Sequence, residues 1–101
     1  TERKTDINAL HGQLEASSAQ NGFYPTLDNV NSSSWRAANM PGLDAQALRD
    51  PKGTATTLGK TVTAVQYGYA TSGCTSAGEC TGYTLTAMLS NGTAYTKQSL
   101  N

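Results

Sequence analysis

Apolar residues recur at helical spacing near the start of the chain. Ile7, Leu10 and Leu14 lie three and four positions apart, which places them on one face of an α-helix, and polar residues fill most of the positions between them. This pattern predicts a helix over residues 1–21 that buries one narrow stripe against another element. Gly12 costs about 1 kcal/mol relative to Ala in a helix interior, so we expect this helix to depend on tertiary contacts.

The predicted helix has a clear C-terminal signal. Asn21 and Gly22 tolerate the left-handed backbone conformation that commonly ends a helix, and Pro25 prevents the helix from starting again. Two aromatic residues, Phe23 and Tyr24, lie directly behind this corner. We therefore expect them, together with Leu27, to pack at the seam between the helix and the sheet predicted below.

The middle of the chain, residues 22–61, reads as a connecting loop with short helical turns. One turn should begin at a serine cap within residues 32–34, with Trp35 as the anchor of the loop. A second turn should begin at Asp44, whose side chain suits an N-cap. Residues 50–53, DPKG, are typical of a β-turn.

Residues 62–101 change to a β-rich pattern. Val62 and Ala64 alternate with threonines, and Tyr67 and Tyr69 follow two positions apart, which predicts a first strand with both tyrosines on one face.

Two further strands follow the cysteine-containing loop. Alternating apolar residues predict the second strand over residues 83–89. Asn91–Gly92 is a signal for a type I′ hairpin, which leads into a third strand around Tyr95. Together with the helix, these strands predict an α+β fold in which the N-terminal helix packs on a three- to four-stranded antiparallel sheet.

Length and composition limit the size of the core and the classes of partner. A chain of 101 residues with 37% hydrophobic content supports one core, so residues 1–101 are expected to form a single domain. Seven Lys and Arg residues balance seven Asp and Glu residues, and charged residues make up only 14% of the chain. Nucleic acid and anionic lipid are therefore disfavoured as partners, because no net field attracts them.

The two cysteines indicate a disulfide. Cys74 and Cys80 lie in CTSAGEC, a flexible turn sequence that can bring two Cβ atoms to within about 4 Å. The alternative is a zinc site, which requires three or four ligands and would have to recruit His11 from the distant helix. A disulfide would imply an extracytoplasmic compartment.

Candidate catalytic and binding residues are few. His11 lies mid-helix without a free thiol or an elbow serine to activate, and Asp44 and Asp50 are accounted for by an N-cap and a turn. We therefore expect no enzymatic activity, no metal and no cofactor. Trp35 and Arg36 form a candidate binding surface because Trp and Arg dominate interface hot spots, with the alternative that Trp35 only fixes its loop to the core.

The order of these features resembles the globular part of type IV pilins and type II secretion pseudopilins. The stretches that carry the resemblance are DINALHGQLEASSAQNGFYPT, a variable loop, LRDPKG, YGYA and the terminal antiparallel meander. In that family a hydrophobic N-terminal helix continues into a charged helical stretch, which ends at a corner similar to N-G-x-Y-P, and D-P-x-G precedes the first strand. The matching positions are Asp6, Ile7, Leu10, Leu14, Asn21, Gly22, Tyr24, Pro25, Asp50, Pro51, Gly53, Tyr67 and Tyr69.

The resemblance implies a non-catalytic structural subunit of an extracellular, cell-surface filament that serves adhesion, twitching motility or DNA uptake. Such subunits have a methylated N-terminus, are anchored as precursors in the cytoplasmic membrane, and are assembled by machinery in the inner membrane. They associate through a hydrophobic N-terminal helix that this sequence lacks. Because the opening TERKTD reads as the interior of a helix, we expect an upstream segment in the full-length protein. Without the hydrophobic helix that joins subunits, we expect the isolated domain to be monomeric. A host-cell or surface ligand is a further expected partner.

Two other functions compete with the pilus subunit. Major pseudopilins hold calcium with acidic residues near the C-terminal strands, whereas Glu79 is the single acidic residue after Asp50, which favours a pilin. A freestanding secreted binding or adhesin module would share the oxidised loop and the threonine-rich surface. The codons upstream of Thr1 distinguish these cases, because a pilin requires about 20 continuous apolar residues there.

Overall fold

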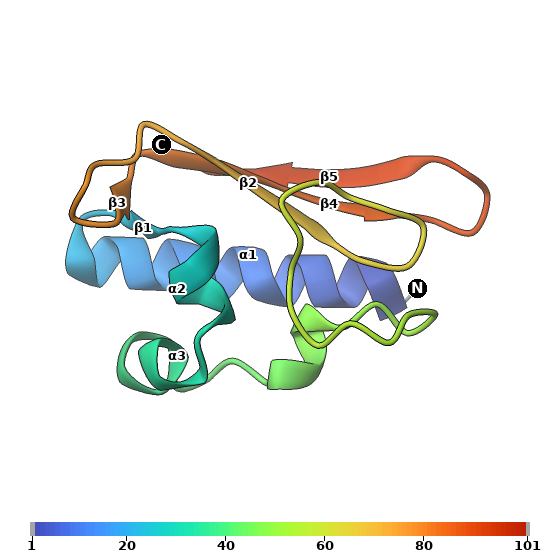
Figure 1. The fold of residues 1–101 in the computed structure, drawn as a ribbon, viewed down its shortest axis with the longest axis horizontal. Helices are drawn as coiled ribbons and strands as arrows, with labels where there is room; N and C mark the ends of the chain where they lie inside the picture. The colour runs from blue at the N-terminus through green and yellow to red at the C-terminus, as the bar shows by residue number, and fades with distance from the viewer. Residues whose placement is uncertain (1, 101) are drawn as a thin grey trace.

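The computed structural model describes residues 2–100 and shows three layers (Figure 1). Helix α1 (Glu2–Asn21) runs through the middle of the molecule, with the three-stranded sheet on one side and the segment containing α2, α3 and η1 on the other. The N-terminus and the C-terminus lie toward opposite ends of the long axis (Figure 1). The α+β class predicted from the sequence is confirmed.

Helix α1 forms as the sequence predicts. Ile7, Leu10 and Leu14 are each 0% exposed, so the whole apolar stripe is buried. The helix ends at Asn21, and Gly22 has a φ of 84° with its N–H donating to the carbonyl of Ser18 over 2.7 Å. Gly22 thus provides the left-handed C-terminal residue that a glycine adopts without steric cost.

The connecting segment contains more helix than expected. Helix α2 (Leu27–Asn31), which the sequence pattern did not indicate, is capped by Thr26, and α3 (Ser33–Asn39) is capped by Ser32 within the predicted serine run. The 3₁₀ helix η1 (Ala45–Leu48) begins at Asp44, whose carboxylate accepts from the N–H of Gln46. The two predicted caps are confirmed, and in each case a side-chain oxygen satisfies an amide that the short helix leaves unpaired.

The main sheet has the strand order β2-β4-β5 and is antiparallel throughout. Its strands are β2 (Gly68–Ser72), β4 (Gly82–Met88) and β5 (Ala94–Gln98). Strand β4 is central, and its alternating burial places Tyr83, Leu85 and Ala87 toward α1 and the neighbouring threonines on the outer face.

The predicted first strand begins too early. Val62 and Ala64 lie in a loop that bends at the bridge between Thr63 and Gln66, and the strand starts only at Gly68. A Cβ on Gly68 would lie 2.6 Å from the backbone nitrogen of Val62, so the loop passes directly over the start of β2. The alternation of Val and Thr over these residues indicated a strand, but the chain folds back on itself there.

The predicted type I′ hairpin is also wrong. Gly92 has a φ of 86°, but no non-glycine residue among 2–100 has a positive φ, so Asn91 lacks the conformation that type I′ requires. The N–H of Gly92 donates to the carbonyl of Leu89, and the N–H of Leu89 donates to the carbonyl of Thr93. A one-residue-longer loop with glycine in the left-handed position therefore joins β4 to β5.

A second, two-stranded sheet joins the end of α1 to the cysteine loop. Its strands are β1 (Tyr24–Pro25) and β3 (Glu79–Cys80), which pair antiparallel with Tyr24 opposite Cys80. The sequence did not indicate this sheet, because both strands are two residues long. It fixes Tyr24 at the seam between helix and sheet, where the residue is 1% exposed.

The buried apolar side chains form one cluster between α1, the main sheet and the connecting segment. The members of this core are Ile7, Leu10, Leu14, Tyr24, Val30, Met40, Ala47, Leu48, Leu58, Tyr67, Tyr69, Cys80, Tyr83, Leu85 and Ala87. Four of them are tyrosines with buried rings and polar tips, so the core needs hydrogen-bond acceptors at its rim.

Candidate functional site

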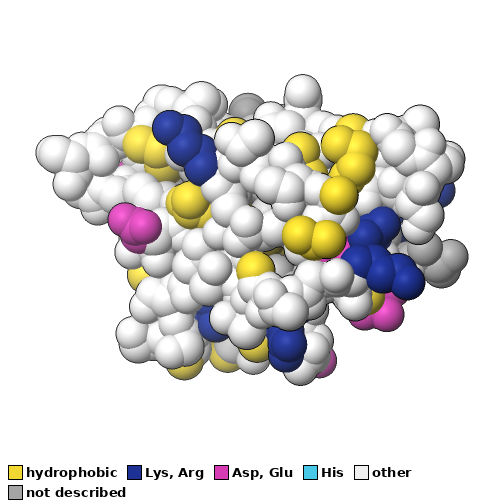
Figure 2. Space-filling view, turned by 45° about the vertical axis from the view of Figure 1, so that its right-hand side comes forward, with side chains coloured by type: hydrophobic (Ala, Val, Ile, Leu, Met, Phe, Trp, Pro, Cys, Tyr) yellow, Lys and Arg dark blue, Asp and Glu magenta, His cyan; other side chains and the backbone are white. Residues whose placement is uncertain are grey.

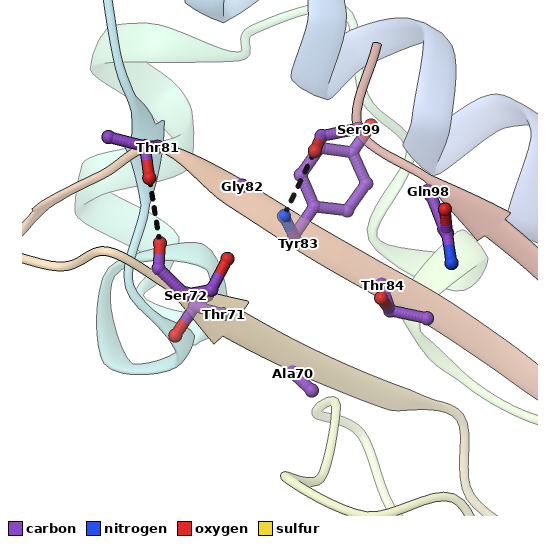
Figure 3. A pocket seen from close by; sticks show the side chains of 9 residues that line it. All are labelled: Ala70, Thr71, Ser72, Thr81, Gly82, Tyr83, Thr84, Gln98 and Ser99. Carbon is purple, nitrogen blue, oxygen red and sulfur yellow. Dashed lines mark hydrogen bonds between the residues drawn. The ribbon is translucent and has the colours of Figure 1, made fainter. Parts of the chain in front are cut away.

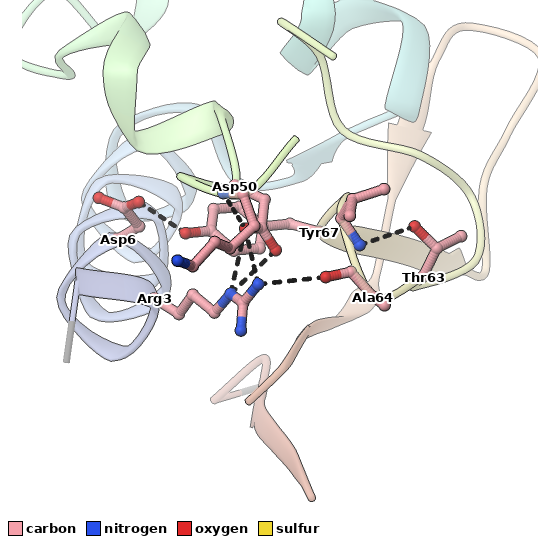
Figure 4. A network of polar contacts seen from close by, with 8 residues as sticks. Arg3, Asp6, Asp50, Thr63, Ala64 and Tyr67 are labelled. Carbon is pink, nitrogen blue, oxygen red and sulfur yellow. Dashed lines mark hydrogen bonds and ion pairs between the residues drawn. The ribbon is translucent and has the colours of Figure 1, made fainter. Parts of the chain in front are cut away.

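A buried ion pair fixes the first turn of α1 to the DPKG turn (Figure 4). Arg3 Nε donates to both carboxylate oxygens of Asp50 at 3.1 Å, and Arg3 Nη2 donates to the carbonyl of Ala64. The Asp50 side chain is 0% exposed, and its Oδ1 also accepts from the N–H of Lys52. The predicted turn at residues 50–53 is confirmed, with the N–H of Gly53 donating to the carbonyl of Asp50. Asp50 therefore has a second role that its turn position did not reveal.

A second polar contact lies beside this ion pair (Figure 4). The hydroxyl of Tyr67 donates to Asp6 Oδ2 over 2.6 Å. Burial raises the pKa of Asp6 above its usual range, although the hydrogen bond from Tyr67 opposes that rise. Burial and the bond to Asp6 both raise the pKa of Tyr67, so the phenol keeps its proton and remains the donor.

Glu15 accepts hydrogen bonds from three segments of the chain. Its carboxylate oxygens receive the hydroxyl of Tyr24 at 2.7 Å, the hydroxyl of Tyr83 at 2.6 Å and the N–H of Leu100 at 3.3 Å. Burial raises the pKa of Glu15, but the bonds from Tyr83, Tyr24 and Leu100 outweigh burial, so the pKa lies below its usual value. Glu15 is therefore ionised at neutral pH and holds β1, β4 and the C-terminal segment to α1.

Further polar contacts join α1 to β5. The hydroxyl of Tyr95 donates to Asn8 Oδ1 over 2.9 Å, and His11 Nε2 lies 3.2 Å from the carbonyl of Gln98. The ammonium of Lys4 lies 5.7 Å from the centre of the Tyr95 ring, within range of a cation–π contact. Polar contacts thus join α1 to the rest of the molecule from its first turn to its fourth.

Other residues of the family-like pattern also have structural roles, except Pro51. Asn21 Nδ2 donates to Ser17 Oγ and to Asn39 Oδ1, and the hydroxyl of Tyr69 donates to the carbonyl of Pro25. Pro51 lies exposed in the DPKG turn. A Cβ on Gly53 would collide with the carbonyl oxygen of Val65.

The predicted disulfide joins Cys74 to Cys80. Cys74 is exposed and Cys80 is buried in the core at its pairing position opposite Tyr24. Because the disulfide engages both sulfur atoms, the alternative of a zinc site with His11 is excluded. Among residues 2–100 no group of three or more His, Cys, Asp or Glu side chains is arranged to hold a metal ion.

The candidate binding residues Trp35 and Arg36 are neighbours on α3. Trp35 packs partly buried against the core, and Arg36 Nη1 donates to the carbonyl of Val30 over 2.8 Å, which satisfies the end of α2. Both side chains therefore support the fold locally, and their use as a binding surface stays a prediction. Of the two carboxylates considered for catalysis, Asp44 caps η1 and Asp50 is held by Arg3.

Sequence reasoning missed Arg3 and Glu15, although one signal was present for Arg3. Arg3 lies four positions before Ile7, on the same helical stripe as the apolar residues, and is only 8% exposed. A charged residue on a buried stripe requires a partner of opposite charge. The acidic residues of the predicted turns, Asp44 and Asp50, were the candidates for this partner. Glu15 gave no comparable signal, because it lies beside the stripe and its tyrosine partners are distant in sequence.

The outer surface has few charges. Figure 2 shows Lys, Arg, Asp and Glu side chains in small separate groups on a mostly uncharged face.

Comparison of the chain with known protein families, with characterised proteins and with solved structures finds no match. Within the part of the chain that the structure describes, no helix has the length and apolar character needed to cross a membrane.

Proposed function

We propose that this protein is the head domain of a structural, non-catalytic subunit of a type IV pilus-like filament on the cell surface. The observation that carries the proposal is the attachment of α1 along its length. A buried apolar stripe faces the core, and Arg3, Asp6, Asn8 and Glu15 add polar contacts to four different segments. The residue pattern that resembles pilins supports the same function.

This attachment suits a subunit that is held by its first helix. In the pilin family, a hydrophobic helix continuous with the segment corresponding to α1 joins the subunits and docks to the assembly machinery. Tension on a filament would then reach each head through α1. Because the contacts of Arg3, Asp6, Asn8 and Glu15 are spread from the first turn of α1 to the fourth, α1 moves along its axis only if they break together. The head would therefore resist extraction of the helix better than a helix held at one end.

The test is to locate the full-length protein in the cells that produce it. Surface filaments are sheared from cells, sedimented at high speed and probed with an antiserum raised against residues 2–100. We expect the protein in the sedimented filaments, immunogold label along them, and loss of the filaments when the gene is deleted.

The same experiment separates the alternatives. Protein that stays in the soluble supernatant would overturn the proposal in favour of a freestanding secreted module. Deletion that blocks the export of secreted enzymes but leaves the surface filaments intact would overturn it in favour of a secretion pseudopilin. A strain complemented with the wild-type gene is the control for both outcomes.

A further inference from the structure

The outer face of the main sheet carries a cleft of about 560 Å³ at the end nearest the cysteine loop (Figure 3). It is lined by nine residues from β2, β4, β5 and their flanks, and none of the nine is Lys, Arg, Asp, Glu or His. Its volume lies within the range of about 300–1,000 Å³ that is typical of small-molecule sites. The cleft opens on the outer face of the sheet, and two of its lining residues, Tyr83 and Gln98, also contact α1 through the Tyr83 hydroxyl and the Gln98 carbonyl.

The hollow arises from the strand register. Ala70, Thr84 and Gln98 form one row across the three strands, and Ser72 pairs with Gly82 in the next row. Small residues at two diagonal positions leave space between the larger ones. A Cβ on Gly82 would lie 3.0 Å from Ser72 Oγ, so the serine hydroxyl already overhangs the glycine.

Three polar side chains around this hollow have no hydrogen-bond partner within residues 2–100. They are Ser72 from β2, Thr84 from β4 and Gln98 from β5. Hydroxyls both donate and accept, and a primary amide provides two donors and an acceptor. Figure 3 shows Ser72, Thr84 and Gln98 around the backbone of Gly82.

The chemistry of the lining selects the ligand. Without a charged side chain in the cleft, a charged ligand would lose its hydration without gaining a counter-charge. The one aromatic residue of the lining, Tyr83, turns its ring toward the core, where it stacks edge-to-face with Tyr24 at 4.8 Å. Contact is therefore through hydrogen bonds to groups that both donate and accept, as sugar hydroxyls do.

We propose that this cleft binds a neutral saccharide unit, with Ser72, Thr84 and Gln98 as its hydrogen-bonding residues. The site does not depend on the proposed filament, since it lies entirely within the head. Because no ring stacks on the ligand, the affinity for a single sugar is expected to be weak, with a Kd of about 1 mM.

The test is titration of the isotope-labelled domain by NMR. D-glucose, D-galactose and N-acetyl-D-glucosamine are each added to about 50 mM, well above the expected Kd. At least one should cause saturable shifts confined to amides of residues 70–72, 81–84 and 98–99. N-acetylneuraminic acid serves as the charged probe and should cause no shifts there.

Two pairs of matched variants locate the site. Thr84→Val should raise the Kd about fivefold through loss of one hydrogen bond, whereas Thr86→Val, on the same face of β4 but outside the lining, should not. Ala70→Leu should fill the cleft and abolish binding, whereas Ala94→Leu, exposed at the far end of β5, should leave binding unchanged.

Several results would overturn the proposal. Absence of saturable shifts with all three neutral sugars would do so, as would binding of only the charged sugar. Equal Kd values for Thr84→Val and Thr86→Val would show that any binding occurs elsewhere. Filament location is measured independently, so either proposal can fail without the other.

Discussion

Replacing Glu15 by Gln should destabilise the domain, because it removes the negative charge of the side chain. The shape of the side chain remains almost unchanged. In the native protein two phenols, those of Tyr83 and Tyr24, donate to the Glu15 carboxylate at 2.6 Å and 2.7 Å. Hydrogen bonds to an ionised group are roughly twice as strong as neutral ones, which is a loss of about 1 kcal/mol for each bond. Glu15→Gln should therefore cost about 2 kcal/mol, or roughly 8–16 °C in Tm for a domain of this size.

The pH dependence provides the sharper test. The pKa of Glu15 is lowered in the folded protein, so its contribution to stability is present above the unfolded pKa of about 4.3 and is lost as the pH falls through the folded value. The stability difference between wild type and Glu15→Gln should be full at about pH 7 and should shrink toward about pH 3. The pKa of Asp6 shifts upward on folding, but Asp6 is present in both proteins. Its contribution to the pH dependence therefore cancels in the stability difference between wild type and Glu15→Gln.

The assay is urea denaturation followed by circular dichroism at both pH values. Glu79→Gln is the matched control, because Glu79 is an exposed acid and its substitution should change stability by less than about 0.5 kcal/mol. Equal stabilities of wild type and Glu15→Gln at neutral pH would refute the assigned role of the carboxylate. A difference that persists unchanged in acid would show that ionisation of Glu15 is not its source.

Three further substitutions test the remaining contacts. Arg3→Met should cost about 3–5 kcal/mol in chemical denaturation, because it leaves the buried Asp50 carboxylate unpaired, and adding Asp50→Asn should recover part of the loss. Gly53→Ala should cost about 1–3 kcal/mol, because the new methyl group collides with the backbone of Val65. Gly12→Ala, with open space around the new methyl group, should raise stability by about 1 kcal/mol. Similar Tm shifts for the two variants would contradict this geometry. Serine at both cysteine positions should leave a folded domain that is less stable by about 2 kcal/mol, and thiol labelling of the native, unreduced protein should find no free thiol.

The sequence predicted the elements that rest on local rules. The stripe of α1 follows from helical spacing, Gly22 from the conformational freedom of glycine, and the caps at Ser32 and Asp44 from the need to satisfy helix N–H groups. The disulfide follows from the turn-rich sequence between the two cysteines. Each of these signals is contained within a few neighbouring residues.

The features that sequence reasoning missed depend on residues far apart in the chain. The two-residue strands β1 and β3 are too short to carry a pattern, and the Arg3–Asp50 pair joins positions 47 apart. The mistaken strand at Val62 had suitable residues but no partner strand, which only the three-dimensional arrangement reveals. The outer-face cleft likewise requires knowledge of the register that brings Thr84 and Gln98 together.

The position of α1 also constrains when the chain can fold. Contacts between α1 and β5 join positions as far apart as Asn8 and Tyr95, which are 87 residues apart in the sequence. During synthesis, which proceeds at about 5–20 residues per second, the contacts of α1 with β5 cannot form until this last strand has emerged. Long-range contacts of this kind also slow folding, because loop-closure entropy is lost before the contacts form. The domain therefore completes its fold only late in synthesis, and until then its incompletely folded chain is more exposed to proteases.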